Sequence, residues 1–182
     1  RALDATLQLI REHNILYEDV EAVEIGISNP SFLNNPNPTT GLEAKFSLQY
    51  CLGAAILSGK VDRESFDEGQ VHSPKLREAL HKVTLTVQPE IPLDYAQAYN
   101  PVTLRLKDGR TYTRCVRSGE VKGSPEMPLS REELLAKYRD NADHILTKNE
   151  TERSIELMLE LEKVDDVSQI MEAVTGPGAA SA

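Results

Sequence analysis

Tryptophan is absent from this sequence, aromatic residues make up only 5% of it, and no long hydrophobic run interrupts it. Its longest apolar run, from Cys51 to Leu57, is far too short to span a bilayer. A signal-peptide pattern is also missing. We therefore expect no membrane-spanning segment and no membrane partner, and we predict a cytoplasmic location.

Basic residues are scarce as well. The sequence has 20 Lys and Arg against 29 Asp and Glu, which gives a formal net charge of -9, and its basic residues are scattered along the chain. A nucleic-acid binder needs a basic face that displaces counterions from phosphates. The charge balance therefore argues against a nucleic-acid partner. The composition, 40% hydrophobic and 27% charged, is that of a globular domain.

Cysteine and histidine are too few and too dispersed to indicate a metal site. Cys51 and Cys115 form no metal-ligand spacing with each other or with a histidine. None of the histidines has a partner histidine at i+4. They are His13, His72, His81 and His144. Both cysteines lie in apolar or strand-like runs, so we expect buried free thiols in a reducing compartment.

Alternating apolar and polar residues predict strands in four places. These are residues 20–28, 83–87, 102–106 and 111–116. Asp108-Gly109 joins the last two and is a strong hairpin signal. Strands separated unevenly by helices, together with a tight hairpin, favour an α+β fold. We predict an antiparallel sheet of about four strands packed with helices.

Capping residues mark the starts of the predicted helices. Residues 38–59, PTTGLEAKFSLQYCLGAAILSG, predict a single helix that Thr40 and Glu43 cap and that ends at Ser58-Gly59. The other predicted helix starts are Ser73-Pro74, Ser130 with Glu133, Asn149 with Glu152, and Asp165.

Three residues, in the predicted helix at 38–59 and in the loop before it, each have two interpretations. Residues 29–40, NPSFLNNPNPTT, form a long loop, a class of segment that often carries function. Phe32 within it is either a loop anchor or a pocket wall. Lys45 is either a surface lysine whose stem covers apolar residues or a cation facing an anionic ligand across the loop. Tyr50 is either a buried ring with a bonded hydroxyl or an acid or base.

Several segments resemble the C-terminal half of the MmgE/PrpD family in order, spacing and wording. They are PTTGLEAKFSLQYCLGAAILSGKV at 38–61, VTLRLKDGRTYT at 102–113 and MPLSREELLAKYR at 127–139. The resemblance extends from Ala2 to roughly Ala173. It implies a smaller α+β lid domain that closes over the active site of an all-helical domain, usually in homodimers. We accordingly divide the chain into a lid-type domain (1–146), C-terminal helices that belong with an absent helical domain (147–175) and a flexible tail (176–182).

The resemblance also implies an activity. Members of the family are metal-independent, need no cofactor and act on small di- or tricarboxylates such as 2-methylcitrate, as dehydratases, decarboxylases or epimerases. Their shared chemistry is proton transfer or elimination beside a carboxylate. The principal catalytic lysine and histidine lie in a K-P-Y-x-x-C-x-x-x-H-like segment that would precede Arg1, and others lie in the helical domain. No catalytic residue is therefore assigned within this chain, and we expect the chain alone to be inactive.

What the resemblance leaves to this chain is the lid's side of the substrate pocket. The loop SNPSFLNNP, residues 28–36, resembles the family loop that approaches the substrate. The candidate pocket residues are Phe32, Asn34, Lys45 and Tyr50. Phe32 stands where the decarboxylases have a tyrosine. This change argues against decarboxylation of cis-aconitate and leaves dehydration, isomerisation or epimerisation open.

Apolar residues near the C-terminus would pack on the absent helical domain. We expect them to be exposed, disordered or buried by a second copy through residues 150–174, as in a homodimer. They are Ile155, Leu157, Met158, Leu161, Val164, Ile170, Met171 and Val174. The alternative function is a free-standing module for small-anion binding or dimerisation, without catalysis, in which residues 29–40 and Lys45 would hold the anion.

Overall fold

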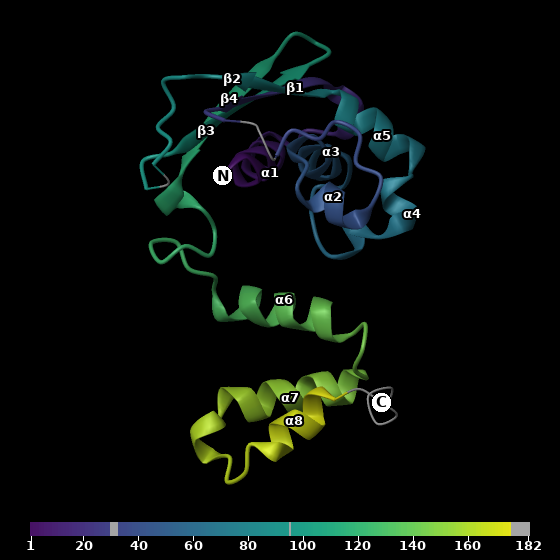
Figure 1. Ribbon diagram of the computed structural model, residues 1–182, viewed down its shortest axis with the longest axis vertical. Helices are drawn as coiled ribbons and strands as arrows, with labels where there is room; N and C mark the ends of the chain where they lie inside the picture. Colours follow the sequence, from purple (N-terminus) through teal and green to yellow (C-terminus); the bar gives the residue numbers. More distant parts are fainter. Residues whose placement is uncertain (30–32, 95, 176–182) are drawn as a thin grey trace. The chain divides into compact units, whose positions relative to one another are not determined.

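The computed structural model describes residues 1–29, 33–94 and 96–175 and divides the chain into two compact units, Arg1–Pro128 and Leu129–Ala182. The first unit contains a four-stranded sheet and the second is built from helices (Figure 1). The predicted α+β class is confirmed. The predicted boundary at 146/147 falls inside the second unit. Among the described residues, no helix has both the length and the apolar character to cross a membrane.

The sheet of the first unit has the strand order β2-β1-β3-β4. Its strands are β1 (Val20–Ile27), β2 (Val83–Val87), β3 (Tyr99–Leu106) and β4 (Thr111–Arg117). Strand β3 pairs antiparallel with β1 and with β4, but β2 lies parallel to β1, with Val23 opposite Val83. The prediction of an antiparallel sheet was wrong for this pair. Residues 28–82 form the long crossover connection that a parallel pair requires.

Helices cover one face of the sheet. Helix α1 (Ala2–His13) packs on β3 and β4, and α3 (Leu48–Ser58) packs on α1 and β2 (Figure 1). The smaller helices beside them are α2 (Gly41–Lys45), α4 (Glu68–Val71) and α5 (Pro74–His81). Short 3-10 turns occupy Tyr17–Asp19, Glu64–Phe66 and Ser118–Glu120. Leu9, Ile25, Leu52 and Leu104 are at most 2% exposed and form the core between the layers.

The predicted single helix over residues 38–59 is interrupted between α2 and α3. Ser47 has an extended backbone, and its hydroxyl accepts a hydrogen bond from the main-chain nitrogen of Tyr50 at 3.0 Å. The same hydroxyl donates to the carbonyl of Asn35 at 2.5 Å. A serine whose hydroxyl accepts this bond is an N-cap, so α3 begins as a separate helix. The same side chain also holds the loop residue Asn35 next to the start of α3. Gly59, with φ 70°, ends the helix as predicted.

Two other local predictions have different outcomes. The hairpin at Asp108-Gly109 is confirmed, with Gly109 at φ 87°. The expectation of two buried thiols was wrong, since Cys51 is half-buried and Cys115 is exposed. Alternation along the edge strand β4 buries Val116 and therefore turns Cys115 outward.

The second unit contains α6 (Arg131–Ala142), α7 (Lys148–Leu159), a 3-10 turn (Leu161–Lys163) and α8 (Ser168–Val174). The capping box of Ser130 and Glu133 is confirmed. The N-cap of α7 is Thr147, two residues before the predicted Asn149, and it forms a capping box with Glu150. Likewise, α8 begins at Ser168 and not at Asp165.

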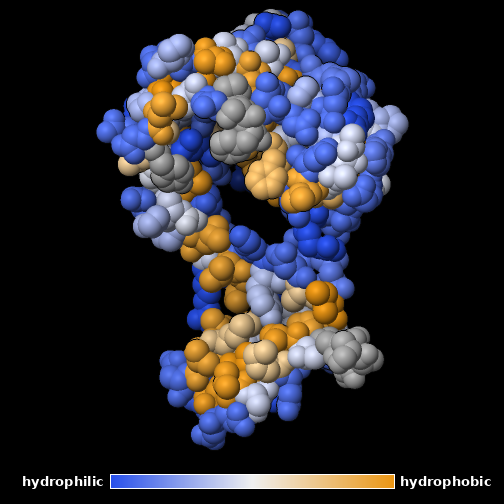
Figure 2. All heavy atoms as spheres, viewed as in Figure 1, coloured by the Kyte–Doolittle hydropathy of each residue, from blue (hydrophilic) through white to orange (hydrophobic). Residues whose placement is uncertain are grey.

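Apolar side chains gather over α7 and α8 (Figure 2). Met158, Leu161 and Met171 are 38%, 55% and 59% exposed. Ile155 and Ile170, in contrast, are 5% and 8% exposed. The apolar residues near the C-terminus were expected to be exposed, disordered or buried by a second copy. This was wrong for Ile155 and Ile170, because α7 and α8 pack on each other.

Candidate functional site

A concave surface lined by both polar and apolar groups lies in the first unit where β1 ends. We call this concave surface of about 540 Å³ the β1 hollow. Six segments meet there: the start of α1, the end of β1 with the residues after it, the start of α3, the start of β3, and the segments that carry Leu93 and Val121. The described residues lining it are Arg1, Ala2, Leu3, Ile27, Ser28, Asn29, Leu33, Leu48, Cys51, Leu93, Tyr99, Asn100 and Val121.

Arg1 is the charged residue among these lining residues, and two neutral side chains hold its guanidinium. Its Nε donates to Oδ1 of Asn100 at 2.8 Å, and its Nη1 donates to the hydroxyl of Ser118 at 3.0 Å. Asn100 is 8% exposed and is itself fixed, since its Nδ2 donates to the carbonyl of Gly26 at 2.9 Å. These bonds fix the position of a positive charge at the wall of the β1 hollow.

The first turn of α3 supplies a thiol to the same hollow. Burial raises the pKa of Cys51 to about 11, so this thiol is protonated at neutral pH. A thiol needs thiolate character to act as a nucleophile. Cys51 therefore contributes polarisable surface to the hollow and no nucleophile.

Tyr50 does not line the β1 hollow. Its side chain is fully buried, and its hydroxyl donates to the carbonyl of Ser65 at 2.6 Å. Burial raises the pKa of Tyr50 to about 12, so the hydroxyl stays neutral in the physiological range. Of the two interpretations of Tyr50, the structure has the buried ring with a bonded hydroxyl.

Lys45 and Asn34 also lie outside the described lining of the β1 hollow. Lys45 is exposed at the end of α2, with its Nζ 5.8 Å from the centroid of the Phe66 ring. Asn34 is exposed and accepts a hydrogen bond from Nε2 of Gln49 at 2.6 Å. Neither residue lines the β1 hollow. Phe32 lies outside the described residues.

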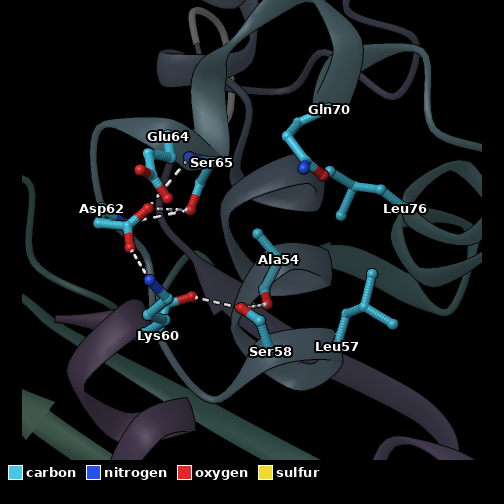
Figure 3. A pocket seen from close by; sticks show the side chains of 9 residues that line it. All are labelled: Ala54, Leu57, Ser58, Lys60, Asp62, Glu64, Ser65, Gln70 and Leu76. Carbon is cyan, nitrogen blue, oxygen red and sulfur yellow. Dashed lines mark hydrogen bonds and ion pairs between the residues drawn. The ribbon is translucent and has the colours of Figure 1, made fainter.

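A second, smaller pocket of about 130 Å³ lies beyond the C-terminal half of α3 (Figure 3). Asp62 forms an ion pair with Lys60 and accepts hydrogen bonds from the main-chain nitrogen and the hydroxyl of Ser65, at 3.0 and 2.8 Å. The hydrogen bond from Lys60 is the main cause that lowers the pKa of Asp62. Because these groups bond to each other across a small space, we interpret the pocket as a structural turn.

His13 and His72 have structural surroundings. His13 stacks on Tyr112, with ring centroids 3.9 Å apart, and His72 lies 3.8 Å from a carboxylate oxygen of Glu68. Among the described residues, His, Cys, Asp and Glu form no cluster that could hold a metal ion.

Comparison with known proteins identifies the family. The family model of the MmgE/PrpD C-terminal domain matches residues 1–163. The chain belongs to the MmgE/PrpD family. It is 34% identical over 160 residues to the cis-aconitate decarboxylase of Mus musculus, a match that covers 88% of this chain and 32% of the relative. The cis-aconitate decarboxylase of Homo sapiens is 34% identical over 170 residues, covering 93% of this chain and 35% of the relative. The chain thus spans about a third of the length of these relatives.

Membership of the MmgE/PrpD family confirms the sequence resemblance, but the residues around the β1 hollow were missed. Arg1 and Asn100 are 99 positions apart, so no local spacing links them. One signal was available. Asn100 is a polar residue at a buried position at the start of a strand, directly before Pro101, and buried amides need partners.

Proposed function

We propose that this chain is the C-terminal, substrate-closing part of a metal-independent lyase or isomerase that acts on a small di- or tricarboxylate such as 2-methylcitrate. Family membership supports the proposal. So does the name of the two relatives, cis-aconitate decarboxylase, since cis-aconitate is a small tricarboxylate. The reaction would be dehydration, decarboxylation or epimerisation, each of which moves a proton or a leaving group beside a carboxylate.

One observation carries the proposal. The sequence resemblance directs two segments toward the substrate, a lysine- and histidine-bearing segment before Arg1 and the loop of residues 28–36. In the fold, Arg1 and the loop residues Ser28, Asn29 and Leu33 line one and the same hollow. A substrate in the β1 hollow would therefore meet both segments.

The hollow supports binding better than it supports catalysis. The thiol of Cys51 has a pKa of about 11, and the guanidinium of Arg1 offers hydrogen-bond donors and no acceptor. A general base works best with a pKa near the operating pH. We therefore propose that the acid and base groups come from outside the described lining of the hollow, and that the chain alone gives no turnover.

The exposed apolar side chains of the second unit suit the same proposal. Met158, Leu161 and Met171 would pack on an N-terminal helical part, because about two thirds of each relative's length has no counterpart in this chain. The competing possibility is that a second copy of the chain covers these side chains. Light scattering of the chain across a concentration range tests it. A stable dimer whose formation depends on Met171 would contradict packing on a helical part.

Activity measurements test the proposed function directly. The whole protein, with the sequence that precedes Arg1 in its reading frame, is assayed for dehydration of 2-methylcitrate and decarboxylation of cis-aconitate. We expect Ser28→Trp, which fills the β1 hollow, to reduce turnover by about a hundredfold or more. Ser58→Trp, in the pocket of Figure 3, is the matched control and is expected to stay within about threefold. Equal loss in both variants, or turnover by the isolated chain, would contradict the proposal.

A second candidate is a module that binds a small anion without catalysis. The positive charge of Arg1 in the β1 hollow favours it. The same assay decides between the candidates, because a binding module gives no turnover even when the whole protein is present.

A further inference from the structure

We propose that Leu33 limits the length of the ligand that the β1 hollow admits, and that Gln49 is a positioning residue that holds Leu33 at the wall of this hollow. The inference rests on the proposed function, because it takes the substrate to bind in the hollow. It adds to that function the residue that limits the hydrocarbon part of the substrate. It assigns no proton transfer and no bond cleavage to either residue.

Three consecutive residues of the loop after β1 are each bonded to the start of α3. The carbonyl of Leu33 accepts a hydrogen bond from the main-chain nitrogen of Leu48 at 3.0 Å. Oδ1 of Asn34 accepts one from Nε2 of Gln49 at 2.6 Å. The carbonyl of the next residue, Asn35, accepts one from the hydroxyl that caps α3, at 2.5 Å. Leu33 can therefore leave the hollow only if this group of bonds is disturbed.

Further bonds hold the same loop a few residues later. Nη2 of Arg77, on α5, donates to the carbonyl of Pro38 at 2.5 Å. Glu43 on α2 accepts hydrogen bonds from the main-chain nitrogen and the hydroxyl of Thr39, at 2.7 and 2.9 Å. A wall that is fixed in this way discriminates by length more sharply than a mobile one, because it cannot yield to a ligand that is too long.

The apolar side of the hollow has one fixed side chain outside the core. Leu33, Leu48 and Leu93 line this side, and a hydrocarbon part of the ligand would gain free energy by covering them. Leu48 packs against the hydrophobic core, whereas Leu33 is not among the described residues that do so. Leu93 is 79% exposed. Leu33 is thus the side chain whose size can set the limit of the hollow without a change in the core.

The amide of Gln49 is better explained by the position of the loop than by stability. Gln49 is 5% exposed, and no described residue donates a hydrogen bond to its buried Oε1. Turning over the amides of both Gln49 and Asn34 would only exchange this oxygen for a buried nitrogen without an acceptor. A buried polar atom without a partner is destabilising, and a methionine would fill the same space without it. What Gln49 contributes is its bond to Asn34, next to Leu33.

The test is inhibition of the whole protein by dicarboxylates that carry an alkyl arm of increasing length. The probes are methyl-, ethyl-, propyl- and butylmalonate, and turnover is measured on 2-methylcitrate and on cis-aconitate. In the unsubstituted protein we expect inhibition to strengthen with arm length until the arm meets Leu33. The next methylene should then weaken it by about tenfold or more. The arm length of the strongest inhibitor is compared between variants.

Substitutions of Leu33 should move this optimum in both directions. Leu33→Ala should move it to an arm longer by about one methylene or more, and Leu33→Phe should move it to a shorter arm. Leu57→Ala is the matched control. Leu57 is also a half-buried leucine, but it lines the pocket of Figure 3, so the optimum should stay where it is.

Gln49→Met tests the positioning role. The loop should yield more easily, so an arm one methylene beyond the optimum should bind about threefold to tenfold more tightly, while kcat stays within about twofold. The melting temperature should stay the same or rise, because the unpartnered oxygen is removed. In the Leu33→Ala background the same change should add less than about twofold, because Gln49 acts through Leu33. Gln70→Met, at an exposed glutamine of α4, is the control and should change neither quantity.

Three outcomes overturn the inference. If the optimum is absent, or is the same in Leu33→Ala and Leu33→Phe as in the unsubstituted protein, Leu33 sets no limit, and continued turnover leaves the proposed function standing. A lower melting temperature of Gln49→Met with unchanged inhibition would make Gln49 a structural residue only. Absence of turnover in the unsubstituted whole protein would contradict the proposed function, and the inference would fall with it.

Discussion

The two units of this chain are stabilised in different ways. In the first unit, the fully buried side chains include Tyr50, Leu9, Ile25, Leu52 and Leu80, which meet between a sheet and its helices. In the second unit, α6 has no buried residue, and the buried apolar side chains of the described part are Leu146, Ile155, Ile170 and Ala173. Because hydrophobic burial is the dominant favourable term in folding, the first unit carries most of the stability that the chain has by itself.

The second unit relies on local polar contacts. Capping boxes begin α6 and α7, and Arg139 binds both carboxylate oxygens of Glu152, at 2.6 and 2.8 Å. Both of these side chains are 41% exposed, and exposed ion pairs contribute at most about 1 kcal/mol. The second unit thus has well-marked helices and few buried apolar side chains among its described residues.

Core truncation gives the largest expected difference between the units. Leu104 on β3 is fully buried, so Leu104→Ala should lower the free energy of unfolding by about 3 kcal/mol. Leu161→Ala removes the same atoms from a side chain that is 55% exposed and should cost less than about 0.5 kcal/mol. Urea unfolding followed by circular dichroism measures both. Comparable losses would show that Leu161 is buried in solution, for example by a second copy.

Glycine substitutions sharpen the same contrast within the first unit. A Cβ added at Gly53 would lie 2.9 Å from the main-chain nitrogen of Leu80, where α3 meets α5. Gly53→Ala should therefore destabilise the protein by about 1–3 kcal/mol, although alanine favours helices. At Gly69 in α4 a Cβ meets nothing within 4 Å, and Gly69→Ala should stabilise by about 0.5 kcal/mol or more. Thermal unfolding measures the two shifts, and a stabilising Gly53→Ala would refute close packing of α3 on α5.

The parts of the fold that sequence predicted are those with a local cause. The hairpin depends on Asp108-Gly109, where Gly109 has φ 87°, and the start of α6 depends on Ser130 and Glu133. Alternation predicted β2 as a strand but could not predict its direction. That direction follows from how residues 28–82 cross the sheet, which is a property of packing.

The site was harder to predict for the same reason. Lys45 and Tyr50 were candidates because they are polar residues in a predicted apolar helix. In the structure this helix is two helices, because the chain breaks at Ser47. The β1 hollow is made by residues such as Arg1, Ser28 and Asn100, which only the folded chain brings together. The family resemblance indicated the loop after β1, because its signal lies in consecutive residues, and a substrate role for that loop stays a prediction.

The same serine-to-alanine change in each unit separates local from tertiary stabilisation. Ser47 is 1% exposed and bonds both to Tyr50 of α3 and to the loop residue Asn35. Ser130 is exposed, and its hydroxyl caps α6 alone. Ser47→Ala should cost about 2 kcal/mol, because it leaves the carbonyl of Asn35 and the buried N–H of Tyr50 without their partner. Ser130→Ala should cost about 1 kcal/mol or less.

Hydrogen exchange distinguishes the two effects. Loss of the Ser130 cap should speed exchange in the first turn of α6, at Glu133, and leave the sheet unchanged. Loss of Ser47 should speed exchange in the loop, in α3 and at Tyr50 together, because one hydroxyl joins them. If Ser130→Ala instead speeds exchange through α7 and α8, the helices of the second unit form one cooperative core, and the contrast between the units is smaller than their burial indicates.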